Sequence, residues 1–232
     1  MTKHGVSPII ARAPGVRRTR FGLPVDALLM ALLAAVSLTS CLSLGNANEF
    51  AVYGLNLEMP KRTGPAVTWQ LLVDVPSAAD PVSSQRIVLK PGARAYGVFE
   101  KARWTDRAPE LLQALLIEGF EDSTRVIGVG RMSSSVGGDI ALIGELRAFE
   151  AEFPDEGQAF AHIVYSAKLV HYSSSRVLTA RVFEQRVPTG GRDLPSVVEA
   201  FERGVNAMVP EIVDWSLTAG DANWQAAFPQ QR

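Results

Sequence analysis

The sequence predicts a single α/β domain in which a mixed, largely antiparallel sheet packs against two amphipathic helices. Three long runs rich in β-branched and aromatic residues follow one another between short turns, which is typical of an antiparallel meander. Two other segments repeat apolar residues every three or four positions, the period of a helix with one buried face. Helices of this kind need a sheet face to cover, so a layered domain is expected.

Short strands are predicted in the first half of the domain, starting with residues 50–57. Residues 69–75 include apolar residues at both odd-numbered and even-numbered positions, which indicates a strand buried on both faces. Residues 86–90 and 93–100 flank a Pro91-Gly92 turn and should form a hairpin.

The first helix is predicted over residues 106–121, with Asp106 as N-cap and Pro109 in the first turn. Polar positions such as Gln113 are expected to face solvent. A short strand over 125–130 should follow. The apolar stripe of the helix comprises Trp104, Ala108, Leu111, Leu112, Leu115, Leu116, Gly119 and Phe120.

The three long strands are predicted over residues 140–153, 158–171 and 176–187, joined by tight turns. The second helix follows Gly190-Gly191. We expect Asp193 to cap this helix at its N-terminus, Pro195 to lie in its first turn and Pro210 to kink it. Its apolar stripe should end at Trp215. The domain should therefore cover residues 50–217, and residues 218–232 form a polar, loosely ordered C-terminal tail.

The segment before the domain has the three parts of a secretory signal peptide. A basic lead that includes Arg17 and Arg18 precedes the apolar run 27–38, and small residues then follow. Leu38-Thr39-Ser40-Cys41 resembles the lipobox of bacterial lipoproteins at every position. Residues 1–40 are thus expected to be removed, with Cys41 as the lipidation site and residues 41–49 as the lipidated cysteine and a short tether.

The alternatives for this segment are an uncleaved transmembrane helix and an ordinary signal peptide with a chance cysteine. A transmembrane helix needs about 18 uncharged residues, and Asp26 interrupts the run too early. Two or three acyl chains on Cys41 make an effectively permanent anchor. The eight residues 42–49 reach about 27 Å when fully extended, so the domain should stay close to its own bilayer.

The composition excludes several function classes. The signal segment holds five of the 23 basic and one of the 24 acidic residues, which leaves 18 basic and 23 acidic residues and a net charge near −5. This balance gives no reason to expect a nucleic-acid partner. Cys41 is the only cysteine, so its lipidation leaves no disulfide, thiol nucleophile or cysteine metal site.

No catalytic, metal or cofactor site is predicted. His162 and His171 have opposite parity in one predicted strand, so they should point to opposite faces, and with no spaced Asp/Glu/His cluster we interpret them as ordinary sheet histidines. Asp74, Glu150 and Glu152 could in principle pair as acid and base. The serine runs 133–135 and 173–175 lack a nucleophile-elbow context and are interpreted as loops. The protein is therefore not expected to be an enzyme.

Several short motifs resemble the ABC-type transport auxiliary lipoproteins, the PqiC-like proteins that accompany MCE-type lipid transport systems. The most telling is Arg103-Trp104-Thr105-Asp106 before an amphipathic helix. The others are Cys41, Val52-Tyr53-Gly54-Leu55, Gln85-Arg86-Ile87, Leu111-Leu112 to Phe120, Leu146-Arg147-Ala148-Phe149-Glu150, Arg181-Val182-Phe183 and the last helix ending at Trp215.

This resemblance implies a non-enzymatic accessory protein without a cofactor, anchored in the inner leaflet of the outer membrane and facing the periplasm. Its implied partners are an MCE-type periplasmic protein, an ABC permease complex and the bilayer itself, and a homo-oligomer is compatible with this role. Leu42 after the cysteine, in place of the aspartate that signals inner-membrane retention, agrees with outer-membrane sorting. The alternatives are a structural envelope-assembly lipoprotein and a periplasmic hydrolase.

Overall fold

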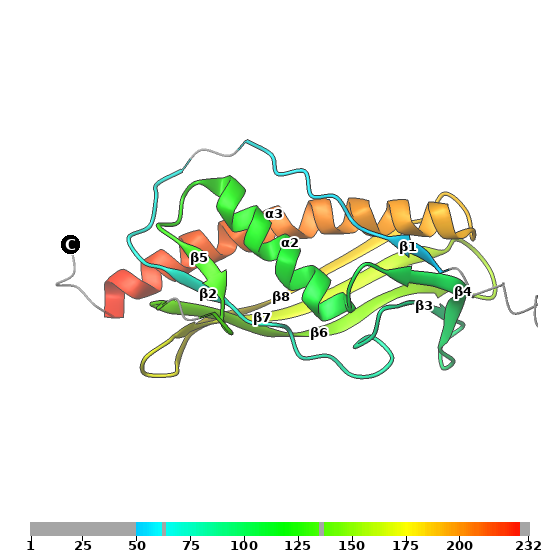
Figure 1. Cartoon of the computed structure of the whole chain (residues 1–232), viewed down its shortest axis with the longest axis horizontal. Helices are drawn as coiled ribbons and strands as arrows, with labels where there is room; N and C mark the ends of the chain where they lie inside the picture. Colours follow the sequence, from blue (N-terminus) through cyan, green and yellow to red (C-terminus); the bar gives the residue numbers. More distant parts are fainter. Residues whose placement is uncertain (1–49, 62–63, 135–136, 228–232) are drawn as a thin grey trace, which may run out of the picture. The chain divides into compact units, whose positions relative to one another are not determined.

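In the computed structural model, which describes residues 50–61, 64–134 and 137–227, one mixed sheet of eight strands packs against two helices (Figure 1). The single α/β domain with two helices is as predicted. The helices are α2 (Ala108–Ser123) and α3 (Leu194–Ala227). The strands are β1 (Ala51–Tyr53), β2 (Leu71–Val73), β3 (Arg86–Pro91), β4 (Gly97–Trp104), β5 (Val129–Arg131), β6 (Ile140–Phe153), β7 (Phe160–His171) and β8 (Arg176–Pro188).

Strand β6 is the centre of the sheet because it pairs with three neighbours. On one edge of β6, β7 pairs antiparallel with β6, and β8 pairs antiparallel with β7, which confirms the predicted meander. On its other edge, β2 pairs in parallel with residues 140–142 and β3 pairs in parallel with residues 150–153. Strand β5 lies beyond β2, and β4 and β1 lie beyond β3.

The prediction of a largely antiparallel sheet was wrong. Four of the seven strand pairings in the described part of the chain are parallel, namely those of β1 with β4, β2 with β5, β2 with β6 and β3 with β6. These involve short strands joined to their partners by long connections that return the chain in the same direction. The strands expected over 50–57, 69–75 and 125–130 are present but only three residues long each.

Helix α2 buries the predicted apolar stripe, but two of its predicted polar features were wrong. The N-cap residue is Arg107, without a side-chain cap, and Asp106 instead accepts a hydrogen bond from the Arg107 N–H. Gln113 is buried, because its Nε2 donates to the Val73 carbonyl oxygen of β2 at 2.9 Å and its Oε1 accepts from Arg131 of β5. A polar residue on the helix thus ties it to the sheet.

Helix α3 continues ten residues beyond the end predicted for the domain. Asp193 caps it as predicted, since Oδ1 accepts from the Ser196 N–H at 3.0 Å, and Pro210 lies inside it. The predicted loose tail from residue 218 was wrong up to residue 227, because the indole of Trp224 is buried and packs on the His171 ring at 5.5 Å. Within the described residues, no helix combines the length and apolar content that a bilayer span requires.

Both helices lie on the same face of the sheet and contact each other (Figure 1). Beneath them is an aromatic cluster in which Trp104 of β4, Phe149 of β6 and Phe201 of α3 meet with ring centroids 4.7–5.7 Å apart. From Phe160 to Leu169, the period of two along β7 buries odd-numbered residues against α3 and leaves even-numbered residues on the opposite face, which we refer to as the outer face.

Candidate functional site

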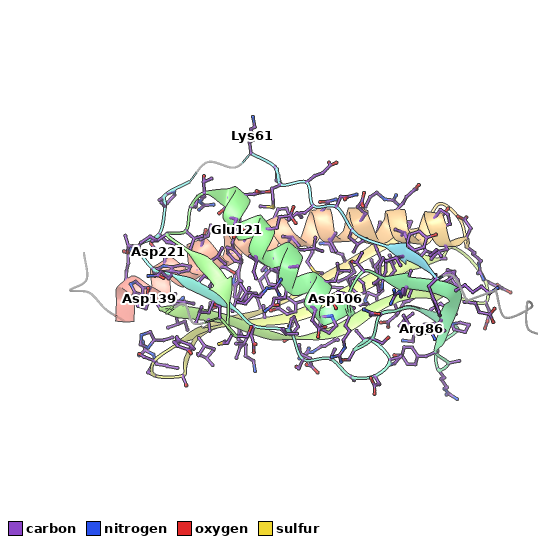
Figure 2. All side chains as sticks on the ribbon, viewed as in Figure 1. Lys61, Arg86, Asp106, Glu121, Asp139 and Asp221 are labelled. Atoms are coloured by element: carbon purple, nitrogen blue, oxygen red, sulfur yellow. The ribbon has the colours of Figure 1, made fainter. Side chains whose placement is uncertain are left out.

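The predicted lipidation site, Cys41, lies outside the residues that the structure describes, as do the signal segment and the tether. The candidate sites described below all lie in the domain that begins at Phe50. Figure 2 shows how charged side chains such as Arg86, Asp106 and Asp139 are distributed over it.

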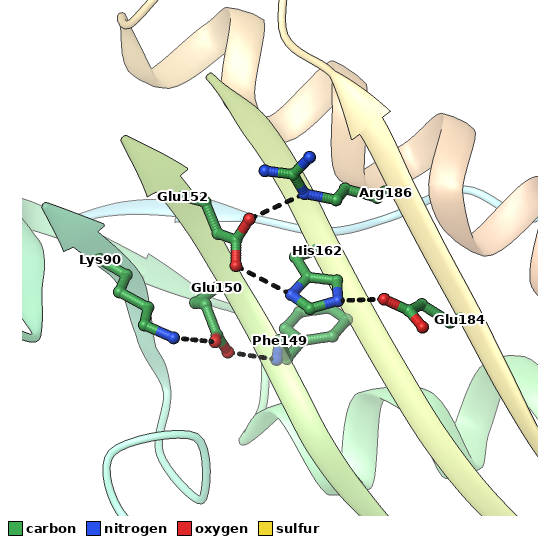
Figure 3. Close-up of polar contacts among 7 residues, drawn as sticks. All are labelled: Lys90, Phe149, Glu150, Glu152, His162, Glu184 and Arg186. Carbon is green, nitrogen blue, oxygen red and sulfur yellow. Dashed lines mark hydrogen bonds and ion pairs between the residues drawn. The ribbon is translucent and has the colours of Figure 1, made fainter. Parts of the chain in front are cut away.

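A cluster of charged residues from four strands lies on the outer face (Figure 3). Strand register explains the arrangement: Glu150 of β6, His162 of β7 and Arg186 of β8 are consecutive cross-strand partners. Glu152 and Glu184 lie two residues away on their strands and so share the same face. Lys90 joins the cluster from β3. We refer to these six residues as the outer-face cluster.

His162 is the centre of the cluster because both ring nitrogens face a carboxylate. Nδ1 lies 3.1 Å from Glu152 Oε1, and Nε2 lies 2.9 Å from Glu184 Oε1. A neutral imidazole donates from one nitrogen only, so both contacts are hydrogen bonds only when the ring carries its second proton. Arg186 adds a further hydrogen bond, from Nε to Glu152 Oε2 at 2.9 Å.

Glu150 and Glu152 differ in their electrostatic environment. Glu150 is buried, and this burial raises its pKa, although its hydrogen bond from the Phe149 N–H at 2.9 Å and Lys90, whose Nζ is 3.9 Å from Oε1, oppose the shift. Burial also disfavours the charged form of Glu152, but the hydrogen bond from Arg186 and the charges of His162 and Arg186 outweigh it, so the pKa of Glu152 is lowered.

The cluster has the donor groups of a metal site, and the sequence reasoning missed this. Ligand atoms of Glu150, Glu152 and His162 all lie within 4.8 Å of one another. The signal that could have found them is the Glu-x-Glu alternation just before the turn that joins β6 to β7, since the hairpin register, with Glu152 opposite Phe160, places His162 opposite Glu150. Arg186 already pairs with Glu152 and Lys90 with Glu150, and both positive charges oppose a cation there, so the geometry favours an ion-pair network that joins four strands.

The other candidate residues are not brought into this cluster. Asp74 lines a separate hollow of about 430 Å³ with Glu145, Arg147 and Lys168, where charges of both signs mix. His171, at the other end of β7, contacts Ser174 Oγ through Nδ1. The prediction that the two histidines share no site is confirmed. Ser133-Ser134 and residues 173–175 lie in turns, as predicted.

A hollow of about 440 Å³ opens beside the cluster and is lined by Lys90, Glu152, Arg186 and the turn between β6 and β7. Its open, charged walls differ from the apolar pockets that hold small substrates. Of the serines named above, Ser174 has a histidine partner, because its Oγ lies 2.6 Å from His171 Nδ1, and this pair lies at the exposed tip of the β7–β8 hairpin.

Comparison with known proteins identifies the family. Residues 53–213 match the family described as ABC-type transport auxiliary lipoprotein component, a range that includes strands β2 to β8 and most of α3. The chain belongs to this family. The family of auxiliary lipoproteins implies a lipid-anchored location in the cell envelope, association with an ABC transport system and a non-catalytic role.

Two solved structures and one curated relative are similar to this chain. The crystal structure of protein XCC0632 from Xanthomonas campestris, of the DUF330 family, superposes with a TM-score of 0.72 at 31% identity, covering 75% of this chain and 99% of that one. A second crystal structure, of an uncharacterised protein, has a TM-score of 0.56 at 17% identity, covering 71% of this chain and 97% of that one, and so shows the shared fold alone.

The curated relative is the uncharacterised protein bll6063 from Bradyrhizobium diazoefficiens, 26% identical over 167 residues. The match covers 71% of this chain and 44% of the relative, so the chain spans less than half the length of that protein.

Proposed function

We propose that the chain is the non-enzymatic auxiliary lipoprotein of an MCE-type lipid transport system. Acylated Cys41 holds it in the inner leaflet of the outer membrane, facing the periplasm, where it docks with an MCE-type protein fed by an ABC permease complex. The observation that carries the proposal is the family match over residues 53–213 in a chain whose Leu38-Thr39-Ser40-Cys41 motif supplies the acylation site.

The outer face of β7 and β8 is the surface offered to the periplasmic partner. The helices cover the opposite face, whereas Val182 on β8 is 51% exposed and Glu184 is exposed beside it. Strand β8 pairs only with β7, so its other edge has no strand partner within the described sheet. A rigid sheet face with an apolar residue among charged ones suits specific, reversible docking.

In-envelope crosslinking tests this function. A photo-reactive amino acid at Val182 should crosslink to an MCE-type protein, identified by mass spectrometry, in envelopes of the native organism. The matched control places the same group at Glu199, which is exposed on α3 on the other side of the domain. Crosslinks from Val182 to peptidoglycan-associated or lipopolysaccharide-assembly proteins, with none to an MCE protein, would support the structural alternative and refute the transport role.

A further inference from the structure

We infer that an arginine-rich surface at the start of the domain docks onto the phosphates of anionic phospholipids in the membrane that holds the chain. The surface consists of Phe50, Arg86, Arg103 and Arg107, which together line a hollow of about 560 Å³. We refer to it as the arginine surface. The inference rests on the proposed acylation of Cys41 and adds the orientation in which the domain lies against its bilayer.

The placement of two arginines opposite each other is the first observation. Arg86 of β3 and Arg103 of β4 are direct cross-strand partners in an antiparallel pair, so both guanidinium groups project from the same face. Like charges at such positions repel and destabilise the strand pair. Both side chains are exposed, and within the described residues neither forms an ion pair with a carboxylate. A phosphate between them would turn this repulsion into attraction.

The remaining contacts leave these guanidinium groups free to bind an anion. Arg103 Nη1 donates one hydrogen bond to Gln85 Oε1 at 3.1 Å, and the Arg86 guanidinium lies over the Phe50 ring at 5.2 Å. Both contacts leave most N–H donors of the two side chains available.

Arg107 is more constrained than the other two arginines. Its Nη1 lies 3.4 Å from Glu110 Oε1, and its Nη2 donates to Ser83 Oγ at 2.6 Å. Asp106 also lines the hollow, and its Oδ1 accepts from the Arg107 N–H. Three guanidinium groups thus face two carboxylates, and the surface is locally positive although the chain from Cys41 onward carries a net charge near −5.

The path of the chain places this surface at the membrane. Phe50 is part of the surface, and residues 42–49 alone separate it from Cys41. Eight extended residues reach about 27 Å, so a lipidated Cys41 keeps the surface within that distance of the headgroups. Basic residues this close to anionic lipid are attracted over roughly one Debye length, and an aromatic ring among them can enter the interface. Anionic phospholipid is therefore the occupant that both charge and position favour.

The test measures how the lipoprotein lies on vesicles. The full chain is expressed with its native export, and the acylated product is reconstituted in phosphatidylcholine vesicles with or without phosphatidylglycerol. A fluorescent donor is attached at Thr105→Cys, beside the arginine surface, or at Ser173→Cys in the β7–β8 turn at the other end of the domain (Figure 1). Energy transfer to headgroup-labelled lipid reports distance from the bilayer. Because Cys41 is the only native cysteine, a label count of one per chain also reports that its sulfur is modified.

We expect transfer to be stronger from position 105 than from position 173 on anionic vesicles, and the difference to disappear on neutral vesicles or in high salt. Arg86→Gln with Arg103→Gln should lower the ratio of docked to undocked domain by about fivefold for each arginine removed. The matched control is Lys168→Gln with Arg176→Gln, which removes the same charge from exposed positions elsewhere on the sheet and should keep the native pattern.

Equal transfer from both positions, with one label per chain and vesicles that still retain the protein, would overturn the docking and leave the lipid anchor intact. A double arginine variant that behaves like the native protein would overturn it as well. Two labels per chain together with loss of vesicle binding would instead refute acylation, and the docking with it.

Discussion

Replacing Phe201 by alanine should remove much of the stability of the domain, because this ring joins α3 to the sheet. Its side chain has no exposed surface and lies 5.3 Å from the Trp104 ring and 4.7 Å from the Phe149 ring, centroid to centroid. Truncating a buried phenylalanine costs about 3–5 kcal/mol, through lost burial and the cavity that remains. The total free energy of unfolding of a domain of this size is about 5–15 kcal/mol.

Graded variants make the prediction quantitative. Phe201→Leu keeps most of the volume, so it should cost about 1–2 kcal/mol. Phe99→Ala is the matched control, because Phe99 is only partly buried and the ring of Phe153, which it contacts, lies 6.1 Å away from centroid to centroid. Phe99→Ala should lower the free energy of unfolding by about 1 kcal/mol. The assay is urea unfolding followed by far-ultraviolet circular dichroism, which does not depend on the tryptophan that the variant disturbs.

The order of the three variants in free energy of unfolding tests whether the aromatic cluster holds α3 to the sheet. If Phe201→Ala lay within about 1 kcal/mol of the native protein, or if Phe99→Ala cost more, the aromatic cluster would not be the contact that holds α3 to the sheet.

Three further outcomes are expected. Gln113→Ala should cost about 1–2 kcal/mol in urea unfolding, because it removes a buried hydrogen bond while the Val73 carbonyl keeps its bond from the Met132 N–H; no loss would contradict the buried role of this amide. Burial raises the pKa of Glu150 in the folded protein above 4.5, so the stability that this residue contributes is lost as the pH rises through the folded pKa. Glu150→Gln should therefore become more stable relative to the native protein above pH 4.5. Identical pH profiles of stability for the two proteins would contradict this. Asp193→Ala should lower the thermal midpoint and Asp193→Asn should restore it, since both Asp and Asn accept the Ser196 N–H bond, and equal midpoints for both variants would exclude a capping role.

The elements with strong periodicity were predictable from sequence. The meander of β6, β7 and β8 and the apolar stripe of α2 follow from local composition, and the structure has them at nearly the predicted boundaries. The direction of β2 was not predictable, because its three apolar residues bury equally well in a parallel or an antiparallel ladder. The end of α3 was missed because Trp224 is the one large apolar side chain in residues 218–227, and its packing on His171 depends on the tertiary fold.

The candidate site shows the same division. The opposite orientation of His162 and His171 followed from their spacing alone. The ion-pair network around His162 did not, because Lys90 and Glu184 reach it from strands whose register is set by turns and bulges. Gln113 was assigned to solvent by its polarity, and only the Val73 carbonyl and Arg131 beside it explain its burial.

Mass spectrometry of the protein isolated from its native membranes tests the membrane-held role most directly. The account predicts that the N-terminal peptide begins at Cys41 and carries a thioether-linked diacylglycerol on the sulfur. An N-terminal peptide that retains residues before Cys41, with an unmodified thiol, would contradict the anchor on which both the proposed transport role and the docking of the arginine surface depend.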